Sequence, residues 1–193
     1  MQSVCVFCGS STGSNAAYTE AARSLGTMLA EANIRLVFGG GHVGLMGEIS
    51  NAALAAGGDV IGVIPKFLVE RELAHEGLTD LRIVGSMHER KALMSDLSEA
   101  FIALPGGTGT LEEFFEVLTW AQLGEHKKPC GLLNVAGYYD PLLTVFDRMV
   151  EVGFLSESNR ALLLVEGDPE RLLQRFDHYE PPKIAKWVDR SET

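Results

Sequence analysis

The chain of 193 residues has few cysteines, few basic residues and no long hydrophobic run. Three cysteines are too few for a disulfide scaffold, which predicts free thiols and a cytoplasmic protein. Lys and Arg number 16 against 26 acidic residues, a formal net charge of −10, so we expect no general nucleic-acid binding. No apolar run reaches about 18 residues, and the first residues lack the basic start of a signal peptide, so we expect no membrane association or secretory leader.

Two of the cysteines, Cys5 and Cys8, form a C-x-x-C pattern. Redox motifs of this spacing place the first cysteine at a helix start, whereas both cysteines here lie in the strand-like run SVCVFC. Residues three apart on a strand face opposite sides of a sheet, so we interpret both as buried core thiols. The five histidines show no zinc-type spacing, and we expect no metal site.

Apolar runs alternate with helical patterns along the whole chain, and the runs are near-continuous, as in strands buried on both faces. The expected strands are 3–8, 35–38, 59–64, 81–85, 100–104, 129–134 and 161–165. The expected helices are 15–32, 43–56, 87–98, 110–123, 138–152 and 169–177. We therefore predict a Rossmann-like, three-layer α/β fold, with a central parallel sheet of six to seven strands and helices on both faces.

The sequence predicts one nucleotide-binding domain, residues 1–178, and a loosely held tail, residues 179–193. Pro181 and Pro182 stop any helix at the start of that tail. Residues 66–80 form the one irregular connection, and connections of this length often cover a site.

In open parallel sheets, ligands bind beyond the carboxyl ends of the strands. Two glycine-rich segments are expected there, GGGHVGLMGE (39–48) and PGGTGTLEE (105–113). Each joins glycines to a helix start, whose unpaired N–H groups and partial positive charge suit an anion. The glycines could instead only make tight turns, but two such loops at one edge favour a nucleotide or a sugar phosphate.

The first of these segments also fits G-x-G-x-x-G at Gly39, Gly41 and Gly44, the pattern of dinucleotide-binding oxidoreductases. Two observations weaken this alternative. The pattern follows the second expected strand instead of the first, and the next strand ends in Pro65-Lys66 instead of a ribose-binding acid.

Charged residues flank the second glycine segment. Thr110-x-x-Glu113 matches a capping box, in which Glu113 would only close its own helix. A carboxylate one turn from a phosphate loop could instead face a sugar. Arg90 and Lys91, in SMHERK, are expected at the same sheet edge, where a guanidinium could bind phosphate or position a carboxylate.

These motifs together resemble the LOG ("Lonely guy") family of cytokinin-activating phosphoribohydrolases, whose members are often mislabelled lysine decarboxylases. The family motif P-G-G-x-G-T-x-x-E is present without a gap as Pro105 to Glu113. CVFCGSSTG, LVFGGGHVGLMG, VIPKFL and MHERKALM follow in the family's order, and the resemblance spans about residues 2–155.

The resemblance implies hydrolysis of the N-glycosidic bond of N6-modified adenosine 5′-monophosphates or AMP, without a cofactor, by a homodimer or a higher homo-oligomer. It implies Arg90 and Glu113 as the catalytic pair. Its substrate-binding residues would be Glu72, Lys91, Gly106, Gly107, Thr108, Gly109, Thr110, Leu111, Glu112 and Thr119. From the glycine loops we add Gly9, Ser10, Gly40 and Gly41. A non-catalytic nucleotide or cofactor carrier of the same fold stays an open alternative.

Overall fold

The computed structural model describes residues 1–71 and 74–182, and it contains seven strands, all paired in parallel. The strands are β1 Ser3–Phe7, β2 Arg35–Phe38, β3 Val60–Pro65, β4 Asp80–Val84, β5 Ala100–Ala103, β6 Cys130–Leu133 and β7 Leu163–Glu166. Their order in the sheet is β4-β3-β2-β1-β5-β6-β7. The predicted parallel sheet is confirmed.

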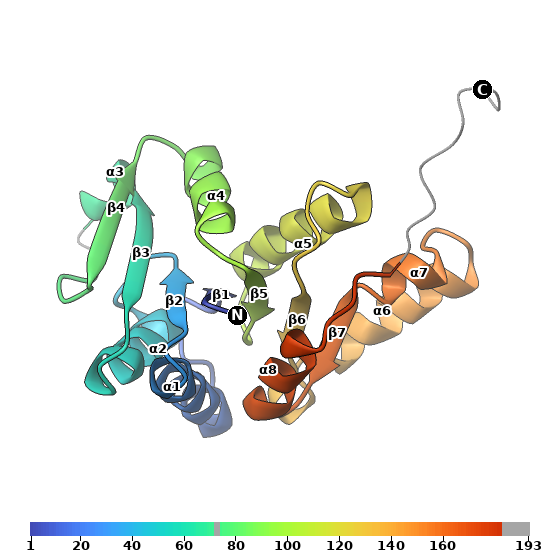
Figure 1. Ribbon diagram of the computed structural model, residues 1–193, viewed down its shortest axis with the longest axis horizontal. Helices are drawn as coiled ribbons and strands as arrows, with labels where there is room; N and C mark the ends of the chain where they lie inside the picture. Colours follow the sequence, from blue (N-terminus) through green and yellow to red (C-terminus); the bar gives the residue numbers. More distant parts are fainter. Residues whose placement is uncertain (72–73, 183–193) are drawn as a thin grey trace.

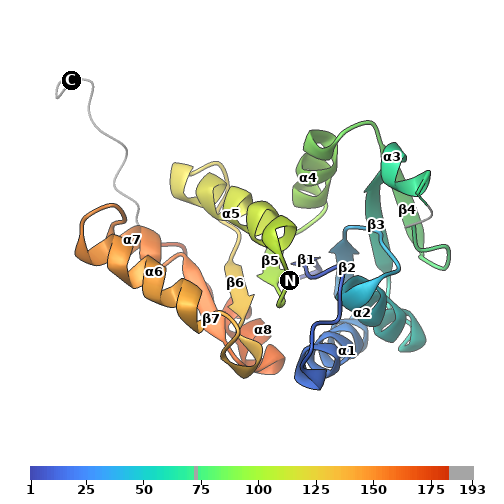
Figure 2. The same cartoon turned by 180° about the vertical axis from the view of Figure 1, so that it is seen from behind.

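Helices cover both faces of this sheet (Figures 1 and 2). They are α1 Ala16–Glu31, α2 Gly44–Ala55, α3 Lys66–Val69, α4 Met87–Asp96, α5 Thr108–Leu123, α6 Asp140–Glu151, α7 Glu157–Arg160 and α8 Pro169–Asp177, with a short 3-10 helix, η1 Val135–Gly137. The predicted three-layer architecture is confirmed. Within the described part of the chain, no helix is both long and apolar enough to cross a bilayer.

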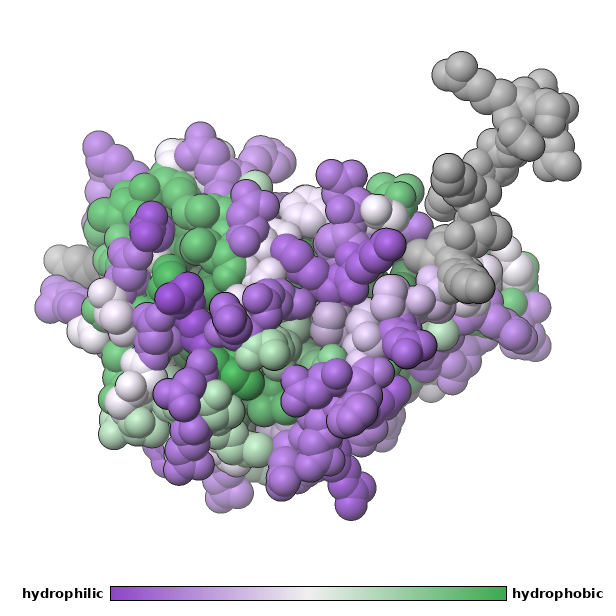
Figure 3. Space-filling model, viewed as in Figure 1, coloured by the Kyte–Doolittle hydropathy of each residue, from purple (hydrophilic) through white to green (hydrophobic). Residues whose placement is uncertain are grey.

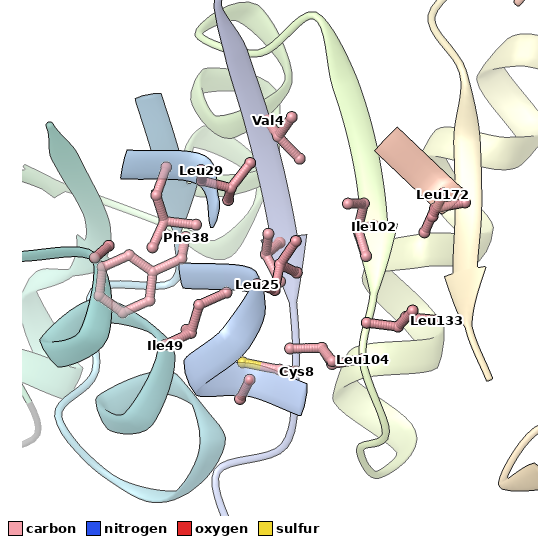
Figure 4. Packing of buried hydrophobic residues seen from close by; sticks show 14 of the residues in the cluster. Val4, Cys8, Leu25, Leu29, Phe38, Ile49, Ile102, Leu104, Leu133 and Leu172 are labelled. Carbon is pink, nitrogen blue, oxygen red and sulfur yellow. The ribbon is translucent and has the colours of Figure 1, made fainter. Parts of the chain in front are cut away.

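Two hydrophobic clusters join the layers. Apolar residues of α1, α2 and α8 pack against one face of the sheet, and Figure 4 shows members of this cluster such as Leu25, Ile49 and Leu172. Residues of α4, α5 and α6 pack against the other face. Cys8 belongs to the first cluster and Cys5 to the second, and both are buried, so the prediction of core thiols on opposite faces is confirmed.

The sequence placed most elements within two residues of their observed bounds. The irregular connection of residues 66–80 contains the short helix α3 and ends where β4 begins. Residues 72–73 and 183–193 lie outside the described chain, so the predicted role of Glu72 and most of the predicted tail cannot be placed. The division into one domain and a tail stays a prediction.

The order of the strands defines where the chain changes direction. From β1 the chain winds outward through β2, β3 and β4, and it then returns to the other side of β1 to form β5. The carboxyl ends of β1 and β5 therefore diverge into loops on opposite sides of the sheet. This topological switch point is where open α/β sheets bind their ligands.

Candidate active site

Arg90 is the fourth residue of α4, which begins at a capped N-terminus. Ser86 Oγ accepts a hydrogen bond from the Glu89 N–H at 3.1 Å, and Glu89 Oε2 accepts one from the Gly85 N–H at 2.7 Å. Reciprocal caps of this kind satisfy the free donors of a helix start. The cap fixes the direction in which α4 leaves β4 and carries Arg90 over the sheet edge.

The Arg90 guanidinium is held by the ends of two strands and by α5. Its Nε donates to the Val63 carbonyl at 3.0 Å, and its Nη2 donates to the Gly39 carbonyl at 3.1 Å. Its Nη1 lies 3.0 Å from Glu113 Oε1, and the two side chains are only 10% and 12% exposed. A Cβ at position 39 would lie 1.9 Å from Nη2, so any side chain there would displace the guanidinium. Of the two roles predicted for Arg90, this geometry favours the partner of Glu113.

Glu113 faces Arg90 and does not close its own helix. Helix α5 begins at Thr108 with Gly107 as its N-cap, and no side chain caps it. Thr110 is the buried third residue of that helix, so the capping-box alternative is wrong. Burial raises the pKa of Glu113 above the ordinary carboxyl range, while the positive charge of Arg90 opposes this shift.

Lys91 connects α4 to α5 through two carboxylates. Its Nζ lies 2.5 Å from Glu112 Oε1 and 3.1 Å from Glu116 Oε2, and its side chain is 10% exposed. Burial disfavours the charged ammonium, but the negative charges of the two carboxylates outweigh it and raise the pKa of Lys91. Lys91 is therefore a charged brace between the helices, beside the Arg90–Glu113 pair.

A crevice of about 270 Å³ lies at the switch point between the β1–α1 and β5–α5 loops. Its lining residues are Gly9, Ser10, Ser11, Thr12, Gly13, Tyr18, Leu45, Pro105, Gly106, Gly107 and Tyr138. The two loops touch directly, because the Gly9 N–H donates to the Pro105 carbonyl at 3.1 Å. The first turn of α5 opens beside this crevice, with Thr108 and Gly109 exposed. Its unpaired N–H groups make the crevice suitable for an anion.

Other predicted site residues lie at or behind this crevice. Thr110 packs under the loop, and a Cβ at Gly106 would meet its Oγ1 at 2.1 Å. Leu111 is partly buried and packs against the second hydrophobic cluster. Thr119 lies further along α5, where its hydroxyl donates to the Phe115 carbonyl at 2.7 Å, so the structure does not bring it to the crevice. Tyr18 and Tyr138 also line the crevice, and neither was predicted as a site residue from the sequence.

The glycine segment of residues 39–48 is occupied by contacts within the protein. The Gly40 carbonyl accepts a hydrogen bond from the His75 N–H at 2.9 Å, and Gly41 pairs with Ala74 in an isolated bridge. At the start of α2, the Leu45 N–H donates to the Gly9 carbonyl at 3.0 Å. Because that helix start already has a backbone acceptor, the dinucleotide alternative loses the position for its pyrophosphate.

Gly40 and Gly41 instead lie near a second, wider depression of about 860 Å³. Its lining residues are His42, Asn51, Val69, Ala74, His75, Glu76, Gly77 and Leu81. It contains neither residue of the Arg90–Glu113 pair and none of the β5–α5 loop. Among residues 1–71 and 74–182, no three His, Cys, Asp or Glu side chains lie close enough together to hold a metal ion.

Comparison with known proteins adds sequence and structural relatives. A family model described as "Possible lysine decarboxylase" matches residues 46–176. Cytokinin riboside 5'-monophosphate phosphoribohydrolase LOG1 of Arabidopsis thaliana is 52% identical over 178 residues, which cover 92% of this chain and 84% of that protein. The probable enzyme LOGL2 of Oryza sativa subsp. japonica is 53% identical over 178 residues, 92% of this chain and 73% of that protein.

Solved structures of similar shape are more distant in sequence. A molybdenum cofactor binding protein from Rippkaea orientalis superposes with a TM-score of 0.70 at 21% identity, covering 92% of this chain and 96% of that one. The Moco carrier protein from Chlamydomonas reinhardtii gives a TM-score of 0.68 at 21% identity, with the same coverage. Likeness at this identity shows the fold alone, whereas the sequence relatives share about half of their residues across almost the whole chain. The chain therefore belongs to the LOG family of cytokinin riboside 5'-monophosphate phosphoribohydrolases, the family whose model is described as possible lysine decarboxylase.

Proposed function

We propose that this protein hydrolyses the N-glycosidic bond of N6-modified adenosine 5′-monophosphates and of AMP, releasing free base and ribose 5-phosphate. The observation that carries the proposal is the buried Arg90–Glu113 pair, whose carboxylate lies on the helix that begins at the crevice of the switch point. Family membership supports the same reaction, because the relatives are named as phosphoribohydrolases.

The crevice and the helix start give the substrate its orientation. The 5′-phosphate binds at the β5–α5 loop, Gly106 to Thr110, where helix α5 offers N–H groups and the positive end of its dipole. Glu113 lies six residues after Gly107, roughly 9 Å along the helix at 1.5 Å per residue. This distance is within the reach of a ribose, and we propose that a nucleotide anchored by its phosphate lies with its ribose toward the carboxylate of Glu113.

Glu113 supplies the chemistry at the sugar. Glycosidic cleavage passes through an oxocarbenium-like ribose, whose positive charge a nearby carboxylate stabilises. Glu113 also orients a water, or removes its proton, as the water oxygen bonds to C1′ and the bond from C1′ to the base nitrogen breaks. The base leaves with a proton from solvent. Arg90 stays charged throughout and fixes the position of Glu113.

The proposal is tested by incubating purified protein with AMP and with isopentenyladenosine 5′-monophosphate, followed by chromatography of the products. We expect free adenine and free isopentenyladenine together with ribose 5-phosphate. No base released from either nucleotide would refute the reaction. The carrier alternative predicts that outcome together with tight nucleotide binding, so a parallel binding measurement separates the two.

We also propose that the protein acts in the cytoplasm as a homodimer or a higher homo-oligomer. Exposed apolar side chains support self-association, because a partner copy could bury them. Phe67 is 44% exposed and Ile83 is 57% exposed, and Figure 3 shows hydrophobic surface on the side of the molecule where β4 lies. Light scattering after size exclusion, at several protein concentrations, tests this part; a mass of one chain throughout would contradict it.

A further inference from the structure

The carbonyl groups of the β5–α5 loop all accept hydrogen bonds from donors within the protein. The Tyr139 hydroxyl donates to the Leu104 carbonyl at 2.6 Å, and the Tyr138 hydroxyl donates to the Gly106 carbonyl at 2.5 Å. Between them, the Pro105 carbonyl accepts from the Gly9 N–H at 3.1 Å. The Gly107 carbonyl accepts from the Leu111 N–H at 3.2 Å, within helix α5.

This arrangement decides which side of the peptide groups an anion meets. A peptide group presents a partial negative charge on its oxygen and a partial positive charge on its N–H. A loop whose carbonyls turned toward the crevice would repel a phosphate, whereas a loop whose carbonyls are bonded elsewhere offers its N–H groups. Glycines such as Gly106 and Gly107 could rotate to either orientation, because no side chain restricts their backbone. Something must therefore hold these peptide groups in the binding orientation.

Both tyrosines come from the connection after β6, and that connection is itself tightly ordered. Asn134 Oδ1 accepts a hydrogen bond from the Tyr139 N–H at 2.6 Å, and Asn134 Nδ2 donates to Asp140 Oδ1 at 2.7 Å. Ala136 and Gly137 both adopt the left-handed conformation, with φ of 51° and 73°. The turn thus has one defined path, which points the two adjacent tyrosines at the neighbouring loop.

The two tyrosines reach that loop from different depths. Tyr139 is 2% exposed and belongs to the hydrophobic cluster on the α5 face of the sheet. Tyr138 is 39% exposed, lines the crevice and meets the Tyr18 ring edge-on, with the ring centroids 5.6 Å apart. A substitution of Tyr138 therefore changes the crevice without leaving a cavity in the hydrophobic core.

We propose that Tyr138 is a positioning residue for the phosphate group of the substrate. Its hydroxyl binds the Gly106 carbonyl oxygen, and the same peptide group carries the N–H of Gly107, which is thereby left for the ligand. Tyr139 binds the Leu104 carbonyl, whose peptide group has no N–H because Pro105 follows, so it supports the loop without orienting a donor. The ligand class rests on the proposed function, but the role itself requires only that a phosphate group binds at this loop.

The test compares Tyr138→Phe with wild type by calorimetry, using ribose 5-phosphate, inorganic phosphate and adenosine as ligands. Losing one hydrogen bond that orients the loop should weaken the binding of ribose 5-phosphate and of phosphate about fivefold to thirtyfold. The binding of adenosine, which has no phosphate, should change less than twofold. In turnover of AMP, the KM should rise while kcat changes less than twofold, as when a binding contact alone is lost.

Tyr179→Phe is the matched control, because this tyrosine follows α8 and does not line the crevice. We expect it to bind all three ligands as wild type does. Tyr139→Phe releases the carbonyl of a peptide group that has no N–H, so it should weaken phosphate binding less than Tyr138→Phe does; if that variant does not fold, the more exposed Tyr138 still decides the question. Unchanged phosphate affinity in Tyr138→Phe, or an equal loss for adenosine and ribose 5-phosphate, would overturn the proposal.

The binding experiment separates this inference from the proposed reaction. A protein that binds ribose 5-phosphate in a Tyr138-dependent way, but releases no base from AMP, supports the positioning role and refutes the reaction. A protein that releases base, yet binds phosphate equally well with phenylalanine at position 138, supports the reaction and refutes the positioning role.

Discussion

At the residue scale, the proposed chemistry depends on Glu113, a carboxylate kept largely out of water beside one guanidinium. Burial alone would favour its neutral form, and the Arg90 charge restores part of the preference for the ionised form. The pair therefore sets the pH at which Glu113 becomes the carboxylate that the reaction needs.

Replacing Arg90 by Met should shift the pH dependence of turnover. Burial raises the pKa of Glu113, and Arg90 lowers it, so removing Arg90 raises it further. Activity that requires the ionised carboxylate is present above that pKa and is lost as the pH falls through it. We expect the acidic limb of the kcat profile to move to higher pH in Arg90→Met, with a lower maximum.

The control for this experiment is Arg23→Met, which removes an exposed arginine paired with Glu48. Its profile should overlay that of wild type. An acidic limb that stayed at the wild-type pH in Arg90→Met would show that Glu113 is not the group whose ionisation the profile reports.

The position of Arg90 also depends on Gly39, because the absence of a side chain at residue 39 leaves room for the guanidinium. A Cβ there would lie 1.9 Å from Arg90 Nη2. We expect Gly39→Ala to displace Arg90 and to lower kcat/KM at least tenfold, because small misplacements of catalytic groups are costly. Gly167→Ala, where the nearest atom lies 3.7 Å from the added Cβ, should keep wild-type kcat/KM. Equal kcat/KM values for the two variants would show that catalysis does not depend on the position of Arg90.

At the scale of elements, α4 and α5 are joined at the site by the brace from Lys91 to Glu112 and Glu116. Lys91→Met should lower the free energy of unfolding by about 1–2 kcal/mol, since one charge-assisted hydrogen bond and one ion pair are lost and Glu112 is half exposed. Urea unfolding measures this. Lys127→Met, at an exposed position, is the control and should stay within about 0.5 kcal/mol of wild type. If Lys91→Met lowered the free energy of unfolding no more than Lys127→Met does, the brace would not contribute to stability.

Long elements were predictable and short ones were not. Continuous apolar runs identified all seven strands, and helical periodicity identified the six longer helices. The helices α3 and α7 have four residues each, too few to show a period. Helix α5 begins two residues earlier than predicted, because Thr108 and Gly109 are poor helix formers whose conformation is set by the loop and not by propensity.

The sequence predicted which residues belong to the site, but it did not predict the contacts between them. The sequence placed Arg90 and Glu113 at one sheet edge, but their ion pair depends on how α4 and α5 pack. The carbonyls that hold Arg90, from Val63 in β3 and from Gly39 just after β2, are backbone atoms and leave no mark in the sequence. One feature of the sequence could have indicated Tyr138 and Tyr139: they follow a predicted strand that ends at the same sheet edge as the glycine segment of residues 105–113.

At the scale of the whole molecule, the fold explains why one edge of the sheet carries the site. Seven parallel strands end at that edge, and the reversal of the chain between β1 and β5 directs the two loops that form the crevice to helices on opposite faces of the sheet. Helices on both faces bury the strands and leave this edge as the position where backbone donors can meet a ligand.

The whole molecule also argues against the decarboxylase description of its family model. Decarboxylation by pyridoxal phosphate needs a lysine amine that forms an imine, and such lysines have lowered pKa values. The most buried lysine of the described chain, Lys91, has a raised pKa because it is paired with two carboxylates. We expect no cadaverine from lysine, and no visible imine band, when the protein is mixed with pyridoxal phosphate. Cadaverine formation that Lys91→Met abolishes would contradict this assignment.

Base release by matched carboxylate variants tests the proposed function most directly. Glu113→Gln keeps the shape of the side chain and removes its charge, while Glu116→Gln makes the same change three residues further along α5. With AMP as substrate, Glu113→Gln should lower kcat at least a hundredfold without loss of the fold by circular dichroism, and Glu116→Gln should stay within about threefold of wild type. Wild-type rates of adenine release by folded Glu113→Gln would contradict the central claim that this carboxylate breaks the glycosidic bond.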